Sequence, residues 1–177
     1  LFIVDEVQTG MGLTGSMWAY EQMGIEPDLL AFGKKMQVCG MMGGPRLLEN
    51  EDNVFTSSSR INSTWGGNLI DMVRSSICLE VIEKEGLVDN ARRMGDELLA
   101  GLGELAGHHE MVSNVRGRGL FTAFTLPSSQ LRDTFHSLAL EADLLTLKSG
   151  TRSIRLRPSL NISADEVAEA LGIFEQT

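Results

Sequence analysis

The first six residues, LFIVDE, do most to limit what this chain can fold into. Four consecutive apolar residues are typical of a strand that is buried on both faces of a parallel sheet. Parallel strands need crossover segments, which are usually helices, so the run predicts an α/β fold. Asp5 follows at the carboxyl end of this strand, where α/β proteins commonly place a site. It could hold a magnesium ion beside a nucleotide, hold a proton on a cofactor ring, or only solvate the strand end.

The rest of the chain alternates between helical and strand periodicity, as an α/β fold requires. PDLLAFG at 27–33 predicts a second buried strand, and GMMGGP at 40–45 predicts a glycine-rich turn. In SIRLRP at 153–158 the alternation is strict, with two apolar residues facing one way and two arginines the other. A capping box, SADE at 163–166, predicts the start of a terminal helix. Three further helices are predicted from stripes of residues three or four apart, which are Ile70, Val73, Ile77 and Val81, then Ala91, Met94, Leu98, Leu102 and Leu105, then Leu131, Phe135, Leu138 and Ala142.

Composition and patterning favour a globular protein in three parts. The composition shifts near residues 60–68, which predicts part of one domain at 1–67, a linking helix at 68–86 and a small α/β domain at 87–177. A net charge of −9 without a basic stripe argues against nucleic acid and anionic membranes as partners. The cysteines, Cys39 and Cys78, have no metal-ligand spacing and suit a reducing cytoplasm. Because the chain opens within an apolar run, we expect it to be a piece of a longer protein.

Lys34 is the strongest candidate for a partner to Asp5. It follows the second predicted strand directly, between Gly33 and a glycine-rich stretch, where a lysine is uncommon unless its amine is used or paired. A desolvated amine is a nucleophile that can form a Schiff base, although Lys34 could equally extend from a turn into solvent. The string GKK lacks both the spacing and the hydroxyl residue of a phosphate-binding loop, which weakens the nucleotide alternative. For Lys35, a solvated or ion-paired surface position is predicted.

Four blocks of the sequence together resemble a known enzyme family. DEVQTGMGLTG, PDLLAFGKK, NSTWGGNL and GRGL occur in the order and spacing of the C-terminal half of class III aminotransferases. The resemblance implies fold type I of the pyridoxal 5'-phosphate (PLP) enzymes, with the end of the large domain and the small C-terminal domain in this chain. It also implies a homodimer with a shared active site. The longer strings FGKKMQVCG, SRINSTWGGNL and IRLRP are similar to those of members that transfer the terminal amine of L-lysine to 2-oxoglutarate.

The same resemblance implies a role for each matching residue. Asp5 would keep the pyridine nitrogen of PLP protonated, which makes the ring a better electron sink. Lys34 would carry the cofactor as a Schiff base and then act as the base in proton transfer. The phosphate of the partner subunit's cofactor would be bound by Thr64, for which a simple turn before a helix is the alternative. The remaining implied contacts are Val7 on a face of the ring, Gln8 on its phenolic oxygen, Ser63 beside Thr64, and Arg155 on the substrate carboxylate.

Several alternatives stay open on the sequence alone. The amino donor could be ornithine, acetylornithine or 4-aminobutyrate, because specificity in this class depends on few contacts. A non-catalytic fragment would carry the same motif residues, since the family's main phosphate loop belongs upstream of Leu1. We expect no metal site: His108 and His109 have no acid at a useful spacing, and the methionines suit gaps in a core.

Overall fold

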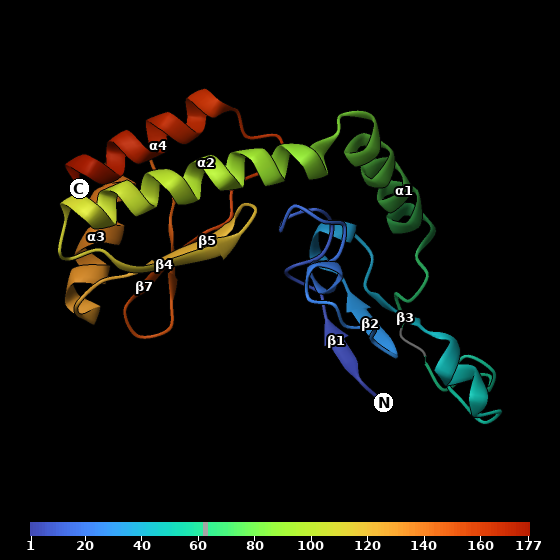
Figure 1. Ribbon diagram of the computed structural model, residues 1–177. Helices are drawn as coiled ribbons and strands as arrows, with labels where there is room; N and C mark the ends of the chain where they lie inside the picture. Colours follow the sequence, from blue (N-terminus) through green and yellow to red (C-terminus); the bar gives the residue numbers. More distant parts are fainter. Residues whose placement is uncertain (62–63) are drawn as a thin grey trace. The chain divides into compact units, whose positions relative to one another are not determined.

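The computed structural model describes residues 1–61 and 64–177, which form two compact units. The first unit consists of Leu1–Met11 and Ser16–Glu85, and the second of Gly12–Gly15 and Gly86–Thr177 (Figure 1). Each unit has its own sheet. None of the helices in the described residues has an apolar stretch long enough to cross a membrane.

The first unit is built on a three-stranded sheet in the order β1-β2-β3. Strand β1 (Ile3–Asp5) pairs in parallel with β2 (Leu29–Phe32), which confirms the predicted pair of parallel strands. Strand β3 (Gly40–Gly43) runs antiparallel to β2, so the prediction of a simple turn at 40–45 was wrong. Its glycines serve packing, because a Cβ at Gly40 would lie 2.6 Å from Phe32 Cζ and one at Gly43 would lie 2.9 Å from Leu47 Cδ2.

The apolar run at the N-terminus is more exposed than its sequence predicts. Leu1 is 69% exposed and Ile3 is 56% exposed, whereas a strand covered on both faces was expected. Strand β1 is an edge strand among the described residues, with β2 on one side only. Two short 3-10 helices, Ala19–Gln22 and Lys34–Met36, lie between the strands of this unit, and a third, Pro45–Glu49, follows β3.

Helix α1 (Leu69–Lys84) ends the first unit and exposes most of its apolar residues. Asn68 caps its start, since the side chain accepts a hydrogen bond from the Ile70 amide. Only Ser75 and Ile82 are buried in the helix. The predicted apolar stripe is present but exposed, at 69% for Ile70, 61% for Val73, 54% for Ile77 and 40% for Val81. Such a face is typical of a surface that another molecule or segment covers.

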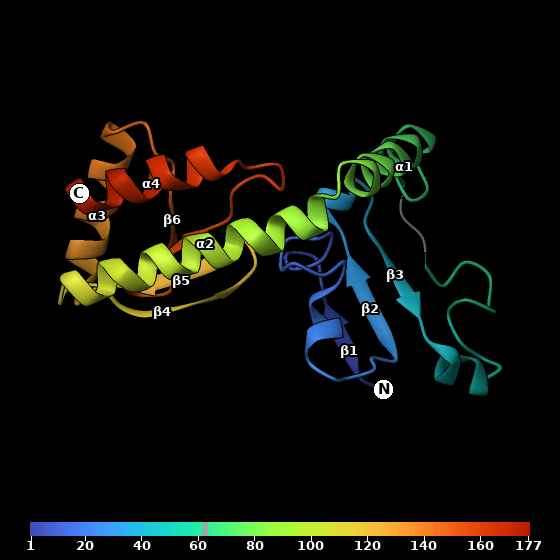
Figure 2. The same ribbon diagram turned by 45° about the horizontal axis from the view of Figure 1, so that its top comes forward.

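The second unit packs helices on one face of an antiparallel sheet in the order β4-β5-β7-β6 (Figures 1 and 2). Helix α2 packs against α4, β4 and β5, and helix α3 packs against β6 and β7. The predicted stripe of α2 is buried throughout, and so are Ile154 and Leu156 of β7, as their alternation predicts. The capping box at the start of α4 is confirmed. The elements are α2 (Leu87–His108), β4 (Ser113–Arg118), β5 (Phe121–Thr125), α3 (Ser129–Glu141), β6 (Leu147–Ser149), β7 (Ser153–Leu156) and α4 (Ala164–Gln176).

A short segment from early in the chain belongs to this second unit. The Gly12–Gly15 segment is bound by two hydrogen bonds, from the Leu120 amide to the Leu13 carbonyl at 2.9 Å and from Arg92 Nη2 to the Gly15 carbonyl at 2.7 Å. Leu13 is 1% exposed and belongs to the hydrophobic core of the unit. Gly12 and Gly15 therefore belong to a segment that packs closely within the second unit.

Candidate active site

Two adjacent carboxylates at the end of β1 have different surroundings. Asp5 is exposed, and its Oδ1 accepts a hydrogen bond of 2.9 Å from the Val7 amide. Glu6 is 2% exposed and accepts hydrogen bonds from the Thr9 hydroxyl and from the Tyr20 amide. Glu6 therefore holds the loop after β1 to the segment that contains Tyr20, while Asp5 lies exposed at the carboxyl end of β1. The sequence pattern does not show that Glu6 is buried and Asp5 exposed, because both residues are acids at the same strand end.

Lys34 lies at the same edge of the sheet as Asp5. Asp5 is paired in register with Ala31 on the neighbouring parallel strand, and β2 ends at Phe32, two residues before Lys34. Lys34 has a φ of 50°, and Gln37 at the end of the same 3-10 turn has a φ of 64°. Left-handed backbone at residues other than glycine is uncommon and gathers at functional sites. The Lys34 side chain is exposed in this chain, so the desolvation expected from sequence is not supplied by the described residues.

The turn before Lys34 is closely packed against the loop after β1. Gly33 is buried, and a Cβ there would lie 3.0 Å from Cys39 Sγ and 3.6 Å from Val7 Cγ1. A side chain at this position would require Cys39 to move by a few tenths of an ångström. Val7 is half-buried at this contact. The packing holds the turn at Gly33 against the loop after β1, next to the strand ends that carry Asp5 and Lys34.

Lys35 has a structural role that was not predicted. Its Nζ donates a hydrogen bond of 2.7 Å to the backbone carbonyl of Gln8, and the residue is half-buried. Lys35 is therefore not a fully solvated surface lysine. The ammonium instead ties the turn after β2 to the loop after β1, since a cationic donor makes a stronger hydrogen bond to a carbonyl than a neutral one does. Gln8 is itself half-buried, and this hydrogen bond to its carbonyl holds its backbone in position.

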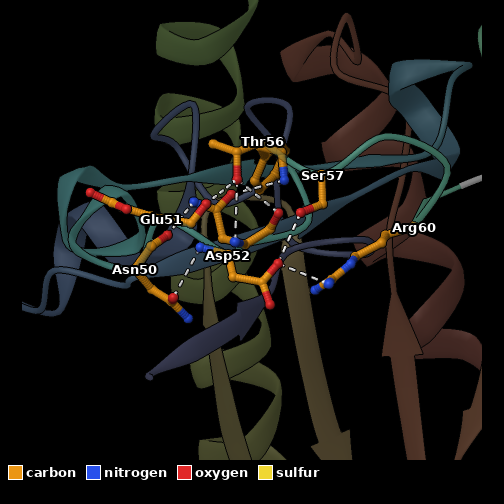
Figure 3. A network of polar contacts seen from close by, with 8 residues as sticks. Asn50, Glu51, Asp52, Thr56, Ser57 and Arg60 are labelled. Atoms are coloured by element: carbon orange, nitrogen blue, oxygen red, sulfur yellow. Dashed lines mark hydrogen bonds and ion pairs between the residues drawn. The ribbon is translucent and has the colours of Figure 1, made fainter.

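Thr64 lies in an exposed turn before helix α1, and Ser63 lies outside the described residues. The loop that precedes them, including the acidic string at 49–52, is exposed but well connected internally (Figure 3). Asp52 accepts hydrogen bonds from the Ser57 hydroxyl at 3.0 Å and forms an ion pair of 2.8 Å with Arg60, while Thr56 donates to the Glu51 carbonyl at 2.7 Å. These contacts give the loop a fixed shape on the N-terminal side of Thr64.

Arg155 belongs to the second unit, on strand β7. Its side chain is half-buried, and the guanidinium carbon lies 5.7 Å from the centroid of the Phe121 ring, within the range of a cation–π contact. Strand β7 ends at Leu156, so Arg157 lies just beyond the strand and is exposed. The structure thus brings Asp5, Val7, Gln8 and Lys34 together in one unit and places Arg155 in the other.

Comparison with known proteins identifies the family. The sequence model of the class-III aminotransferase family matches residues 1–177. The chain belongs to this family. This chain is 50% identical over 173 residues to an L-lysine-epsilon aminotransferase of Amycolatopsis lactamdurans, and 49% identical over 173 residues to one of Streptomyces clavuligerus. Each alignment covers 97% of this chain and 38% of the relative. A probable mitochondrial 4-aminobutyrate aminotransferase of Caenorhabditis elegans is 39% identical over 180 residues, covering 100% of this chain and 36% of the relative.

A solved structure shows the same backbone arrangement. The lysine aminotransferase from Mycobacterium tuberculosis matches with a TM-score of 0.95 at 48% identity, over 98% of this chain and 40% of that chain. This chain therefore spans about two fifths of the length of these lysine aminotransferases. The mixed α/β fold agrees with the predicted fold class.

Proposed function

We propose that the full-length protein is a PLP-dependent aminotransferase that moves the terminal amine of L-lysine to 2-oxoglutarate, giving allysine and glutamate. The parallel pairing of β1 with β2 carries the proposal, because it presents an acid and an amine at one edge of one sheet. The preference for lysine is supported by 50% identity to an L-lysine-epsilon aminotransferase, against 39% for the 4-aminobutyrate and acetylornithine relatives. We assign residues 1–67 to the large domain, 68–86 to a linking helix and 87–177 to the small domain.

The residues at this edge suit PLP by their chemistry. Asp5 offers a carboxylate that is exposed, with one oxygen fixed by the Val7 amide, and such a group can hold a proton on a ring nitrogen. Lys34 offers an exposed amine on a turn whose backbone is held by Gly33 and Lys35. When bound, PLP withdraws electrons from the substrate carbon that loses its proton. Val7 would pack on the ring, and Gln8 would hydrogen-bond its phenolic oxygen.

Each residue of this chain then has a stated task. The Lys34 amine would hold the cofactor covalently and, once released by the amino substrate, would move a proton at the reacting carbon. Asp5 would keep its carboxylate ionised beside the ring nitrogen so that the nitrogen stays protonated. Arg155 would bind the far carboxylate of the substrate with its planar guanidinium, which matches a carboxylate with two parallel hydrogen bonds.

We place the enzyme in a homodimer. The exposed apolar surface of the first unit supports this, since Trp65 is 77% exposed, Leu69 80% and Ile70 69%. In that dimer Thr64, with Ser63, would bind the phosphate of the cofactor in the partner subunit. The free cysteines of the described chain, Cys39 and Cys78, suit the cytoplasm as its location.

The test is the activity of the full-length enzyme with a panel of amino donors. We expect L-lysine to be the best substrate among lysine, ornithine, acetylornithine and 4-aminobutyrate, with 2-oxoglutarate as acceptor. Lys34→Ala should abolish turnover, whereas Lys84→Ala, which removes an exposed lysine of α1, should leave it intact. An active Lys34→Ala enzyme would overturn the central assignment. A better turnover with another donor would leave the aminotransferase in place but refute the lysine specificity.

A further inference from the structure

The sheet of the second unit has one face that carries two arginines in a single row. Arg116 on β4 is paired in register with Ala123 on β5, and Ala123 is paired with Arg155 on β7. Residues directly opposite one another on antiparallel strands point to the same face. The two arginines therefore share a face, about 10 Å apart at their Cα atoms because one strand lies between them. Buried Ile154 and Leu156, the neighbours of Arg155 along its strand, point to the opposite, core-facing side.

Both arginines line the same cavity. It has a volume of about 280 Å³, and Ala123 between the arginines contributes only a methyl group to its wall. The other lining residues are neutral, and Asp and Glu do not occur among the described residues that line it; the complete set is Arg116, Gly117, Phe121, Thr122, Ala123, Ser149 and Arg155. Two like charges at one small cavity repel each other, and an anion between them removes that repulsion.

Arg116 is fixed in position by acceptors that do not neutralise it. Its Nη1 donates to the Asn114 carbonyl at 2.8 Å and to the Thr125 hydroxyl at 3.1 Å. Its Nη2 donates to the Ser153 hydroxyl at 3.2 Å. All three acceptors are neutral, so they hold the guanidinium in place while its positive charge remains available. A charge that is positioned in advance costs little to use for binding.

We propose that Arg116 is a second carboxylate-binding arginine, which acts with Arg155 on the far carboxylate of the substrate and favours substrates without an ammonium group beside that carboxylate. This inference rests on the proposed function, and it deepens it by giving a reason for discrimination between the two substrates. Phe121 orients Arg155 by the cation–π contact, and the hydroxyls of Thr125 and Ser153 orient Arg116.

The two substrates of the proposed reaction differ at their far ends. 2-Oxoglutarate reacts at its keto carbon, so its far end is a carboxylate alone. L-Lysine reacts at its terminal amine, so its far end carries a carboxylate and an α-ammonium on the same carbon. A second cation attracts the first kind of end strongly, whereas for the second kind attraction to the carboxylate is offset by repulsion of the ammonium. Arg116 should therefore matter most for 2-oxoglutarate.

A pair of amino donors isolates this effect in the full-length holoenzyme. 6-Aminohexanoate is lysine without its α-ammonium, so both compounds offer the same terminal amine and the same far carboxylate. We expect Arg116→Gln to lower kcat/KM about tenfold for 2-oxoglutarate and for 6-aminohexanoate, mostly through KM, and to change it less than about threefold for L-lysine. Arg116→Lys, which keeps the charge, should recover most of the loss.

The matched control is Arg118→Gln. It removes the same charge two residues along the same strand, from a residue that does not line the cavity, and it should leave all three values within about twofold. Equal losses for all three substrates in Arg116→Gln would mean that Arg116 only supports the strands, and would overturn the proposal. Unchanged kcat/KM values in Arg116→Gln would also overturn it, as would a loss of the same size in Arg118→Gln.

A binding measurement separates this proposal from the function on which it rests. Glutarate, a dicarboxylate without the reacting carbonyl, is titrated into the full-length protein by calorimetry. Arg116→Gln should weaken its binding about tenfold, and Arg118→Gln should not. If the wild-type enzyme fails to turn over lysine, the proposed function is wrong, yet the titration still decides whether Arg116 binds a carboxylate.

Discussion

Helix α2 offers a set of three glycines whose replacement by alanine tests the packing of the second unit. Gly95 faces the backbone of another element: a Cβ added there would lie 2.2 Å from the Gly119 carbonyl carbon and 2.3 Å from its oxygen. Gly101 faces a side chain instead, with Leu171 Cδ1 at 2.3 Å. Gly103 has nothing within 4 Å of the added atom. All three lie inside the same helix, so the intrinsic benefit of alanine over glycine is the same for each.

The expected free energies of unfolding follow from these surroundings. Alanine is better than glycine in a helix by about 1 kcal/mol, so Gly103→Ala should stabilise the protein by about 0.5–1 kcal/mol. At Gly95 the same benefit is opposed by a clash with backbone, which cannot be relieved by a change of rotamer. Overpacking of this kind costs about 1–3 kcal/mol, and more when main chain must move.

Movement at Gly119 would also disturb the contacts behind it. Gly119 has a φ of 52°, and a Cβ on it would lie 2.5 Å from the Thr14 carbonyl carbon, so the segment 12–15 cannot yield easily. The hydrogen bond from the Leu120 amide to Leu13 lies in the same contact. We therefore expect Gly95→Ala to destabilise the protein by about 2 kcal/mol net, and Gly101→Ala to lie between the other two because Leu171 can change rotamer.

Urea unfolding of the full-length protein, followed by far-UV circular dichroism, measures the series. The difference between Gly95→Ala and Gly103→Ala should be about 3 kcal/mol, which is large compared with the error of the method. The reasoning is refuted if Gly95→Ala is as stabilising as Gly103→Ala, because the helix and the turn at Gly119 would then not be in contact.

Three further predictions concern the site, the assembly and the response to acid. Asp5→Asn keeps the oxygen that accepts from the Val7 amide, so PLP should still bind, while single-turnover kinetics should show proton transfer slowed about a hundredfold, or about 2.7 kcal/mol; near wild-type rates would make Asp5 structural. Inactive Lys34→Ala and Thr64→Ala subunits, mixed into heterodimers, should regain activity, since one of the two shared sites then carries neither defect; heterodimers without activity would contradict the cross-subunit role of Thr64. The backbone amide of Ser163, and then its hydroxyl, donate to Glu166 and lower its pKa below the ordinary 4.5, so the stabilisation is present above the unfolded pKa and is lost as pH falls through the folded value. Glu166→Gln should flatten the loss of thermal stability measured below about pH 5, and an acid limb identical to wild type would show that the capping box does not contribute to it.

The second unit was the easier part to predict from sequence, and its packing explains why. The stripe of α2 is covered by β4, β5 and α4, all of which lie in the same stretch of chain. Local periodicity and burial therefore agree for α2, and the capping box at Ser163 and the alternation of Ile154 and Leu156 appear as expected. The stripe predicted for α3 is not buried in the same way, since Leu131 and Leu138 are each 40% exposed and Ala142 is exposed. The sequence did not reveal the role of Gly119, which belongs to the string GRGL. Its true constraint is a contact with Thr14 and Gly95, which are distant in sequence.

The first unit behaved differently because its apolar patterns are not satisfied within it. Apolar residues in LFIV and along α1 were expected to be covered, yet Ile3, Ile70 and Val73 are mostly exposed among the described residues. Periodicity reports that a face is to be buried, but not by which molecule or segment.

In the candidate site, too, some positions could be predicted from sequence and others could not. The strand-end positions of Asp5 and Lys34 were predictable, because two apolar runs in an α/β chain pair in parallel and end at the same edge. The partner of Lys35 was not, since a hydrogen bond to the Gln8 carbonyl uses the main chain, which carries no sequence signal. Arg116 was overlooked for a related reason. The alternation in RGRG is evident, but only the register across β5 shows that Arg116 and Arg155 stand in one row. Residues that are fixed by their own strand can be found from sequence, whereas a pair created by the register of three strands needs the folded sheet.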